Sequence, residues 1–171
     1  MKTTTKVLLI TLTTAVGVAA AAWAGAFLYW HLRITSAMRV MEAKLPGQMT
    51  PLSWPRDLLD ASEVLNGAGC RALPYYVRSA EPGKDIEVLE HVVGSIIGFV
   101  TAGTSGDDPN DDLAHVLGKR FTIEPQDSPT VRREKCDRLQ AWWSENGSRH
   151  HQWWRIWSPA CPRFDCSVRE R

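Results

Sequence analysis

The stretch "VLLITLTTAVGVAAAAWAGAFLYW", residues Val7 to Trp30, contains no charged side chain. About 20 apolar residues in a helix cross the hydrocarbon core of a bilayer, and in lipid a helix satisfies all its backbone hydrogen-bonding groups internally. Its three threonines can return their hydroxyls to helix carbonyls. Tyr29 and Trp30 stand where an interfacial aromatic belt is expected. We therefore predict that residues 1–30 form an N-terminal region and a transmembrane signal anchor.

A cleaved signal peptide is the alternative for this segment. Lys2 and Lys6 provide a basic start, and "AWA" at Ala22–Ala24 fits a small-residue cleavage pattern. However, the apolar run continues beyond Ala24 to Trp30, and cleavage would leave an exposed hydrophobic N-terminus. The uncleaved anchor is favoured.

The orientation of the span depends on the cysteines, because basic residues flank it on both sides. Four cysteines, an even number, permit two disulfides, which would suit an oxidising compartment. We expect Cys70–Cys136 and Cys161–Cys166 pairs, with four reduced thiols in a cytosolic domain as the alternative. The prediction is an inner (cytoplasmic) membrane protein with its N-terminus in the cytoplasm and its C-terminal domain in the periplasm or otherwise outside.

Small residues recur every four positions within the span, at Thr13, Gly17, Ala21 and Gly25. This spacing places them on one helix face, where another membrane helix could approach closely. An alanine-rich helix also meets this spacing by chance. Gly17, Ala21 and Gly25 are the candidate residues for packing in the membrane.

The rest of the chain divides at its prolines and glycines. Residues 31–55 are expected to form a stalk helix followed by the Pro-rich linker "PGQMTPLSWP". A helical domain is expected at 56–157, with about five helices up to Gly147, and a cysteine-containing tail at 158–171. Ser128-Pro129 is typical of a helix start and Asn146-Gly147 of a helix stop.

Two of these helices have clear apolar faces. The first carries Leu58, Leu59, Ala61, Val64 and Leu65, and it is expected to end at Gly67 or Gly69. A later one spaces its apolar residues as one buried stripe: Ile86, Leu89, Val92, Val93, Ile96 and Ile97. Because no stretch alternates convincingly between apolar and polar residues, the fold class is all-α.

The segment "CRALPYYVRSA", followed by "DIEVLEHVVGSIIG", resembles a HEAT-like repeat. The stretch from Leu117 to Gly147 is similar to the closing segment of some bacterial HEAT-like proteins, in which a helix ends in paired Trp and an Asn. The loop "VTAGTSGDDPND" is longer than a typical repeat turn, and the chain has room for about two units, whereas an extended solenoid needs several. The resemblance implies a compact helical interaction module without catalysis.

The sequence motifs that could form a metal or catalytic site are incomplete. Asp108, Asn110 and Asp112 begin like a calcium loop, but the glycine and the closing glutamate of such a loop are missing. His150 or His151 with Cys161 and Cys166 could hold zinc, yet no second cysteine pair stands nearby. His91 and His115 are read as structural histidines. We therefore expect no catalytic residue, no metal and no cofactor.

Five tryptophans gather near the C-terminus, between Trp142 and Trp157. The simplest interpretation is that the indoles pack together as core. The functional interpretation is that some of them anchor a partner protein, because Trp and Arg are enriched in interface hot spots. The candidate partner-binding residues are Trp142, Trp143, Trp153, Trp154, Trp157, Arg149 and Arg155.

A net charge of +1 gives no broad basic field for nucleic acid. The partners expected are the membrane and other membrane-protein subunits. The sequence favours a non-catalytic, single-pass accessory or scaffold subunit that docks onto a larger membrane complex. The alternative is an envelope-anchored binding module, of sugar-binding or effector/immunity type, that uses the tryptophan cluster.

Overall fold

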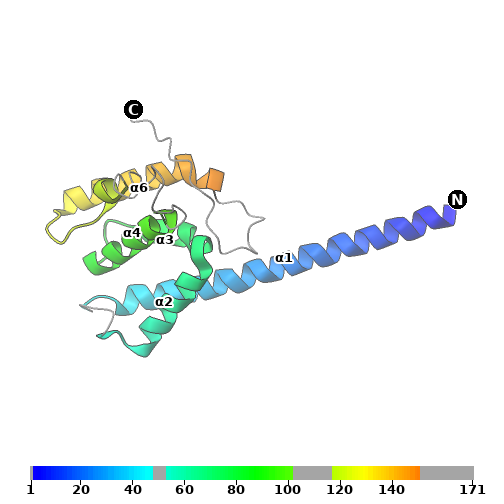
Figure 1. Cartoon of the computed structure of the whole chain (residues 1–171), viewed down its shortest axis with the longest axis horizontal. Coiled ribbons are helices and arrows are strands. Elements are labelled where there is room, and N and C mark those ends of the chain that lie inside the picture. The colour runs from blue at the N-terminus through cyan, green and yellow to red at the C-terminus, as the bar shows by residue number, and fades with distance from the viewer. Residues whose placement is uncertain (1, 48–52, 102–116, 151–171) are drawn as a thin grey trace, which may run out of the picture.

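A computed structural model describes residues 2–47, 53–101 and 117–150 of the chain (Figure 1). All regular secondary structure in these ranges is helical, which confirms the all-α fold class. Residues 117–121 are also helical. The elements are α1 (Lys2–Lys44), α2 (Arg56–Ala68), a 3-10 turn η2 (Gly69–Ala72), α3 (Leu73–Ser79), α4 (Ile86–Thr101) and α6 (Pro129–His150).

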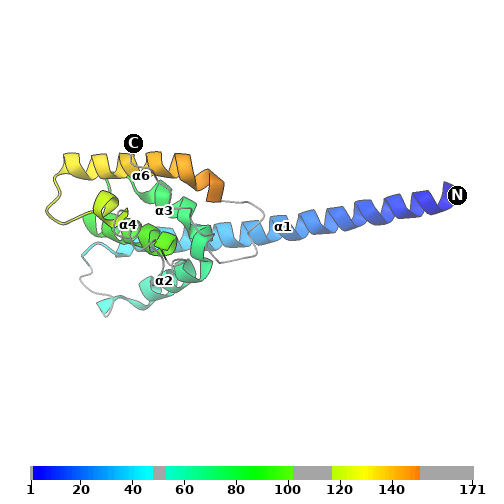
Figure 2. The same cartoon turned by 45° about the horizontal axis from the view of Figure 1, so that its top comes forward.

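Helix α1 has 43 residues, so its length is about 65 Å at the α-helical rise. Its first half extends alone from the body of the protein, as Figures 1 and 2 show. As expected, the threonine hydroxyls donate to carbonyls of the preceding turn: Thr11 to Val7 at 2.9 Å and Thr14 to Ile10 at 2.8 Å. Their polar groups are therefore satisfied within the helix.

The second half of α1 differs from the predicted stalk because it is a wall of the folded domain. Ile34, Met38, Met41 and Leu45 are between 1% and 6% exposed, and they follow the three-to-four-residue spacing of one helix face. Leu32 is 58% exposed and lies off this face. The folded domain thus includes residues 34–45, whereas the sequence placed its start near Arg56.

Helix α2 packs against the core half of α1 (Figure 1). Leu58, Ala61 and Leu65 are buried as predicted, whereas Leu59 is 46% exposed and faces away from the core. The helix ends at Gly69, whose φ of 56° lies in the left-handed region that favours glycine. The predicted glycine stop of this helix is confirmed.

The segment predicted as a second helix is divided into the 3-10 turn η2 and the short helix α3. Pro74 lies in the first turn of α3, where its missing N–H has no intrahelical partner to lose. The backbone leaves the helix at Ala80, ahead of Pro82-Gly83. Gln140 of α6 donates to the Ala80 carbonyl at 3.2 Å, which ties the end of α3 to α6.

Helix α4 buries the predicted stripe at its centre. Leu89, Val92, Val93 and Ile96 are at most 2% exposed, while Ile86 and Ile97 are half-buried. Gly94 and Gly98 are exposed on the other side, so the second half of α4 is covered on one face rather than surrounded by core.

Helix α6 begins as predicted, with Ser128 accepting the N–H of Val131 at 3.3 Å. It then continues through Asn146-Gly147 to His150, so the predicted stop is wrong. Asn146 donates instead to the Trp142 carbonyl four residues earlier at 2.9 Å. The Trp143 indole covers Gly147 so closely that a Cβ there would overlap the ring. The glycine therefore makes room for an indole.

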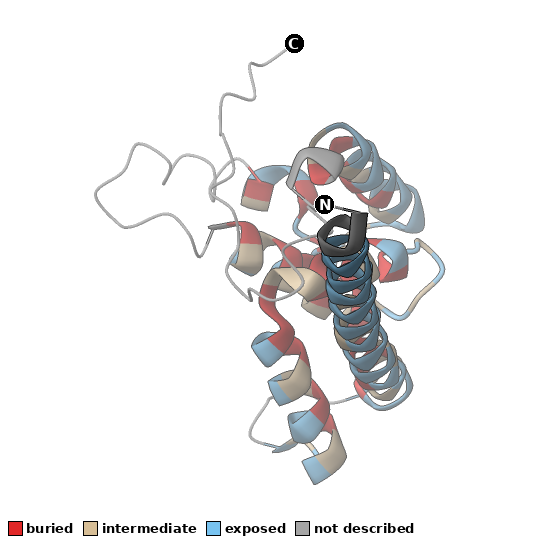
Figure 3. Ribbon diagram, turned by 90° about the vertical axis from the view of Figure 1, so that its right-hand side faces the viewer, coloured by how far each residue is buried: buried red, intermediate tan, exposed pale blue. Residues whose placement is uncertain are grey.

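The helices form three layers (Figures 1 and 2): α1 with α2, then α3 with α4, then α6 on the far side. Buried residues line the faces between these layers, while the projecting half of α1 is exposed (Figure 3). This arrangement places α3 directly against α1, just beyond the point where the apolar run ends.

Candidate functional site

Cationic and aromatic side chains meet where the charge-free run of α1 ends. The Arg71 guanidinium lies 4.5 Å from the ring centroid of Trp30, a cation–π contact. Arg33 donates to the Tyr29 hydroxyl at 2.6 Å and also lies over that ring. Helix α1 and the turn before α3 thus both bring a positive charge to the end of the apolar segment.

Helix α3 runs alongside α1 from this point. Near its start, the Tyr75 hydroxyl lies 2.8 Å from Nδ1 of His31. At its end, Ser79 donates to the carboxylate of Glu42. Burial raises the pKa of Tyr75, so its hydroxyl keeps its proton at neutral pH. These contacts fix which turn of α3 faces which turn of α1.

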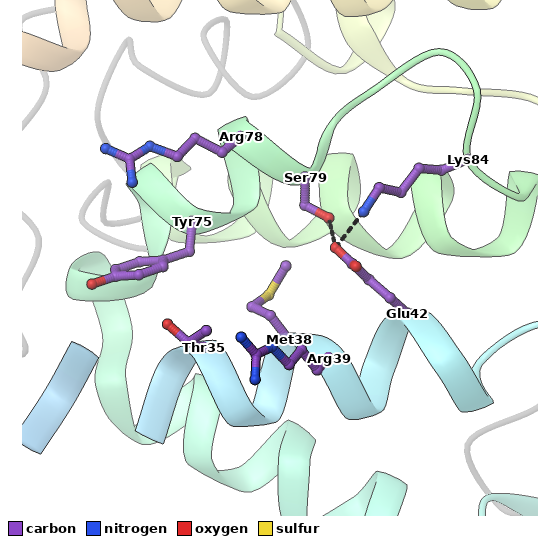
Figure 4. A pocket seen from close by; sticks show the side chains of 8 residues that line it. All are labelled: Thr35, Met38, Arg39, Glu42, Tyr75, Arg78, Ser79 and Lys84. Carbon is purple, nitrogen blue, oxygen red and sulfur yellow. Dashed lines mark hydrogen bonds and ion pairs between the residues drawn. The ribbon is translucent and has the colours of Figure 1, made fainter. Parts of the chain in front are cut away.

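A pocket of about 210 Å³ opens between the two helices (Figure 4). It is smaller than the roughly 300–1,000 Å³ of sites that enclose a drug-sized ligand, so it suits a small chemical group. Seven of its eight lining residues have polar or charged side chains, although most of the surface that they turn to the pocket is apolar. The eight residues are Thr35, Met38, Arg39 and Glu42 from α1, Tyr75, Arg78 and Ser79 from α3, and Lys84 from the following loop.

The charges in this pocket do not balance. Glu42 is engaged by Ser79 and forms an ion pair with Lys84 at 2.6 Å, which closes one end of the pocket (Figure 4). Arg39 and Arg78, on opposite walls, are exposed and form neither an ion pair nor a hydrogen bond with any described residue. Two positive charges are therefore left for an external anion.

The pocket also contains a polar group without a partner. The Thr35 hydroxyl is buried and has no hydrogen-bond partner among the described residues. An unsatisfied buried hydroxyl costs stability, and this one has almost no surface of its own open to the pocket. The two arginines, and not Thr35, make this the strongest candidate binding site in the described part of the chain.

The tryptophans of the predicted partner surface have different positions. Trp142 is 9% exposed and packs with Phe121, at 6.0 Å between ring centroids, so it is a core residue and not a surface anchor. Trp143 is half-buried over Gly147. Arg149 lies in α6. The other predicted residues lie outside the described ranges: Trp153, Trp154, Trp157 and Arg155.

The structure differs from one of the predicted disulfides. Cys136 is a free thiol with no exposed surface, and burial raises its pKa. The predicted Cys70–Cys136 disulfide is therefore wrong. Cys70 is itself disulfide-bonded. Cys161 and Cys166 lie outside the described residues.

The predicted packing face in the membrane is open. Gly17, Ala21 and Gly25 are exposed, and a Cβ added at either glycine would meet nothing within 4 Å. Within the described residues, 2–47, 53–101 and 117–150, one helix is long and apolar enough to cross a bilayer. This helix is α1, and its most apolar stretch is not buried.

The remaining sequence predictions concern metal sites and histidines. In the described ranges, no three His, Cys, Asp or Glu side chains gather in a way that could hold a metal. His91 lies between Trp54 and Tyr76, with ring centroids 5.8 Å and 6.4 Å away, and burial lowers its pKa. The calcium-like segment, His115 and His151 fall outside the described residues, and the side chain of His150 is not described.

Sequence reasoning missed the pocket because its two arginines are far apart in the chain. Arg39 falls in the predicted stalk, and nothing in the sequence singled out Arg78. No local motif joins them, since packing of α3 on α1 creates the site. No protein-family model, curated protein or solved structure matches this chain, so the HEAT-like resemblance stays a prediction.

Proposed function

We propose that this chain is a non-catalytic, single-pass membrane subunit that docks onto a larger membrane complex. The observation that carries the proposal is the division of α1. One continuous helix has a largely exposed apolar run, charge-free from Val7 to Trp30, followed by a part that forms a wall of the folded domain.

The exposed half needs an apolar environment. Val7, Leu8, Leu9, Ile10, Leu12, Val16 and Val18 are each 60–67% exposed. Leaving these side chains in water costs on the order of 10 kcal/mol, comparable with the whole stability of a domain. A bilayer removes this cost and also suits the aromatic and cationic residues at Trp30 and Arg33.

Docking would use two surfaces. In the bilayer, the open Gly17, Ala21 and Gly25 face allows a neighbouring helix to approach the backbone. Outside the bilayer, the proposed surface is the C-terminal Trp and Arg cluster without Trp142, which belongs to the core. Burial of Trp142 weakens the alternative of a ligand platform made from the whole cluster.

The proposed orientation keeps the N-terminus in the cytoplasm and the helical, HEAT-like domain outside it. A disulfide at Cys70 supports this orientation, because disulfides persist in oxidising compartments. The buried thiol of Cys136 is compatible with either compartment.

Affinity capture of tagged full-length protein from native membranes in mild detergent, followed by mass spectrometry, tests the proposal. We expect a stoichiometric membrane partner that is lost with Ala21→Leu, which fills the small-residue face. Ala19→Leu is the matched control, because it makes the same change about 200° around the helix. Recovery of the subunit alone, or equal partner loss with both variants, would contradict docking through this face.

A further inference from the structure

We propose that the pocket between α1 and α3 binds a phosphate-bearing anionic group, supplied by a lipid headgroup at the membrane surface. The placement of the pocket at the membrane surface rests on the proposed membrane anchoring. Its chemistry rests on the residues that line it.

The lining selects an anion. Arg39 on α1 and Arg78 on α3 carry guanidinium groups on opposite walls, and neither forms an ion pair or hydrogen bond with a described residue. Figure 4 shows the Arg78 side chain extending along α3 above Tyr75, so an anion that contacts both arginines requires Arg78 to turn toward Arg39, which its exposed position allows. Guanidinium offers a planar set of N–H donors that matches phosphate oxygens. Glu42, the one acidic residue of the lining, is already held by Ser79 and Lys84. The pocket therefore has donors and positive charge to offer, and its size suits a phosphate group.

The position of the pocket favours a lipid as the source. Thr35 lies five residues, about 7 Å along the helix, beyond Trp30, where the charge-free run ends. The headgroup layer occupies roughly 5–7 Å on each side of the hydrocarbon core. Arg39 lies about 13 Å beyond Trp30, and a long arginine side chain can reach back toward the interface.

The contacts between the helices orient the pocket relative to the membrane. Arg71 lies over Trp30 and Tyr75 contacts His31, so the start of α3 is level with the end of the apolar run. The ion pair between Glu42 and Lys84 closes the opposite end, farther from the bilayer (Figure 4). Thr35 and the two arginines thus belong to the membrane side of the pocket.

The test uses the purified full-length chain in nanodiscs of phosphatidylcholine alone or with increasing phosphatidylglycerol, with thermal unfolding as the readout. A second arm adds inorganic phosphate to the phosphatidylcholine discs. We expect the anionic lipid to raise the Tm of the wild type. Each arginine removed should weaken the apparent affinity by about tenfold, since charge-assisted hydrogen bonds are worth one or more factors of ten.

The variants are the double substitution Arg39→Gln with Arg78→Gln and the control Arg133→Gln, an exposed arginine of α6 on the far side of the domain. The pocket variant should unfold like the wild type in phosphatidylcholine, because both arginines are exposed, and should lose the response to anionic lipid. A wild-type response to inorganic phosphate without a response to phosphatidylglycerol, lost in the same variant, would overturn the lipid source and support a soluble phosphate ester as the ligand instead.

A Tm that responds equally in the pocket variant and the control would overturn the inference, and so would no response to either anion. These failures leave the proposed docking function intact, because capture of a partner does not depend on lipid charge. Failure of the chain to enter nanodiscs would overturn both proposals, since membrane anchoring is their shared premise.

Discussion

Met41→Ala tests whether the second half of α1 is core or stalk. Met41 is 2% exposed on the face that packs against the domain. Truncating a buried methionine to alanine costs about 2–5 kcal/mol, because it removes apolar contacts and leaves a cavity. At about 4 °C per kcal/mol for a domain of this size, the Tm should fall by about 8–20 °C.

Leu32→Ala is the matched control on the same helix, because Leu32 is 58% exposed. Its effect should stay within about 0.5 kcal/mol. The assay is thermal unfolding of the full-length protein in detergent, followed by tryptophan fluorescence. Equal, small losses of stability for the two variants would refute the packing of residues 34–45 into the core and restore the free stalk.

Three further predictions concern single groups. Gly147→Ala should lower the free energy of unfolding by about 1–3 kcal/mol, because its Cβ would overlap the Trp143 indole; a gain in stability, as expected for an open helical glycine, would contradict this. Burial lowers the pKa of His91, so the unfolded state binds more protons and stability present above about pH 6.5 should be lost as the pH falls. His91→Gln should flatten that part of a pH series of urea midpoints. Alkylation after denaturation without reductant should label Cys136 and leave Cys70 in a disulfide-linked peptide; the reverse pattern would disprove the thiol assignment.

The parts of the fold that the sequence predicted depend on local patterns. The apolar stripe of α4 and the glycine at the end of α2 follow from periodicity and backbone conformation, which need no knowledge of neighbouring helices. The apolar length of α1 is equally local. The charge-free run and the Ser128 start of α6 could therefore be predicted from neighbouring residues in the chain.

The missed features depend on packing between distant segments. Asn146-Gly147 has the composition of a helix stop, but Gly147 lies inside the helix because the Trp143 indole packs directly over it. Met38, Met41 and Leu45 stand at helical spacing in the sequence, but nothing local to them shows that this face packs into the domain instead of belonging to a stalk. Arg39 and Arg78 line the same pocket only because α3 packs on α1.

Continuity of α1 links the two proposals. Sharp helix kinks arise at proline, at glycine or serine pairs, or at bulges, and α1 has no proline and no adjacent glycines, since Gly17 and Gly25 are separated along the helix. A tilt or rotation imposed on the Gly17 face by a membrane partner is therefore carried along the helix to the core. Arg39 lies on that helix, and the contacts of His31 with Tyr75 and of Glu42 with Ser79 hold α3, which carries Arg78, against it. If both proposals hold, an anion bridging the arginines and a partner docked in the bilayer act on the position of one helix.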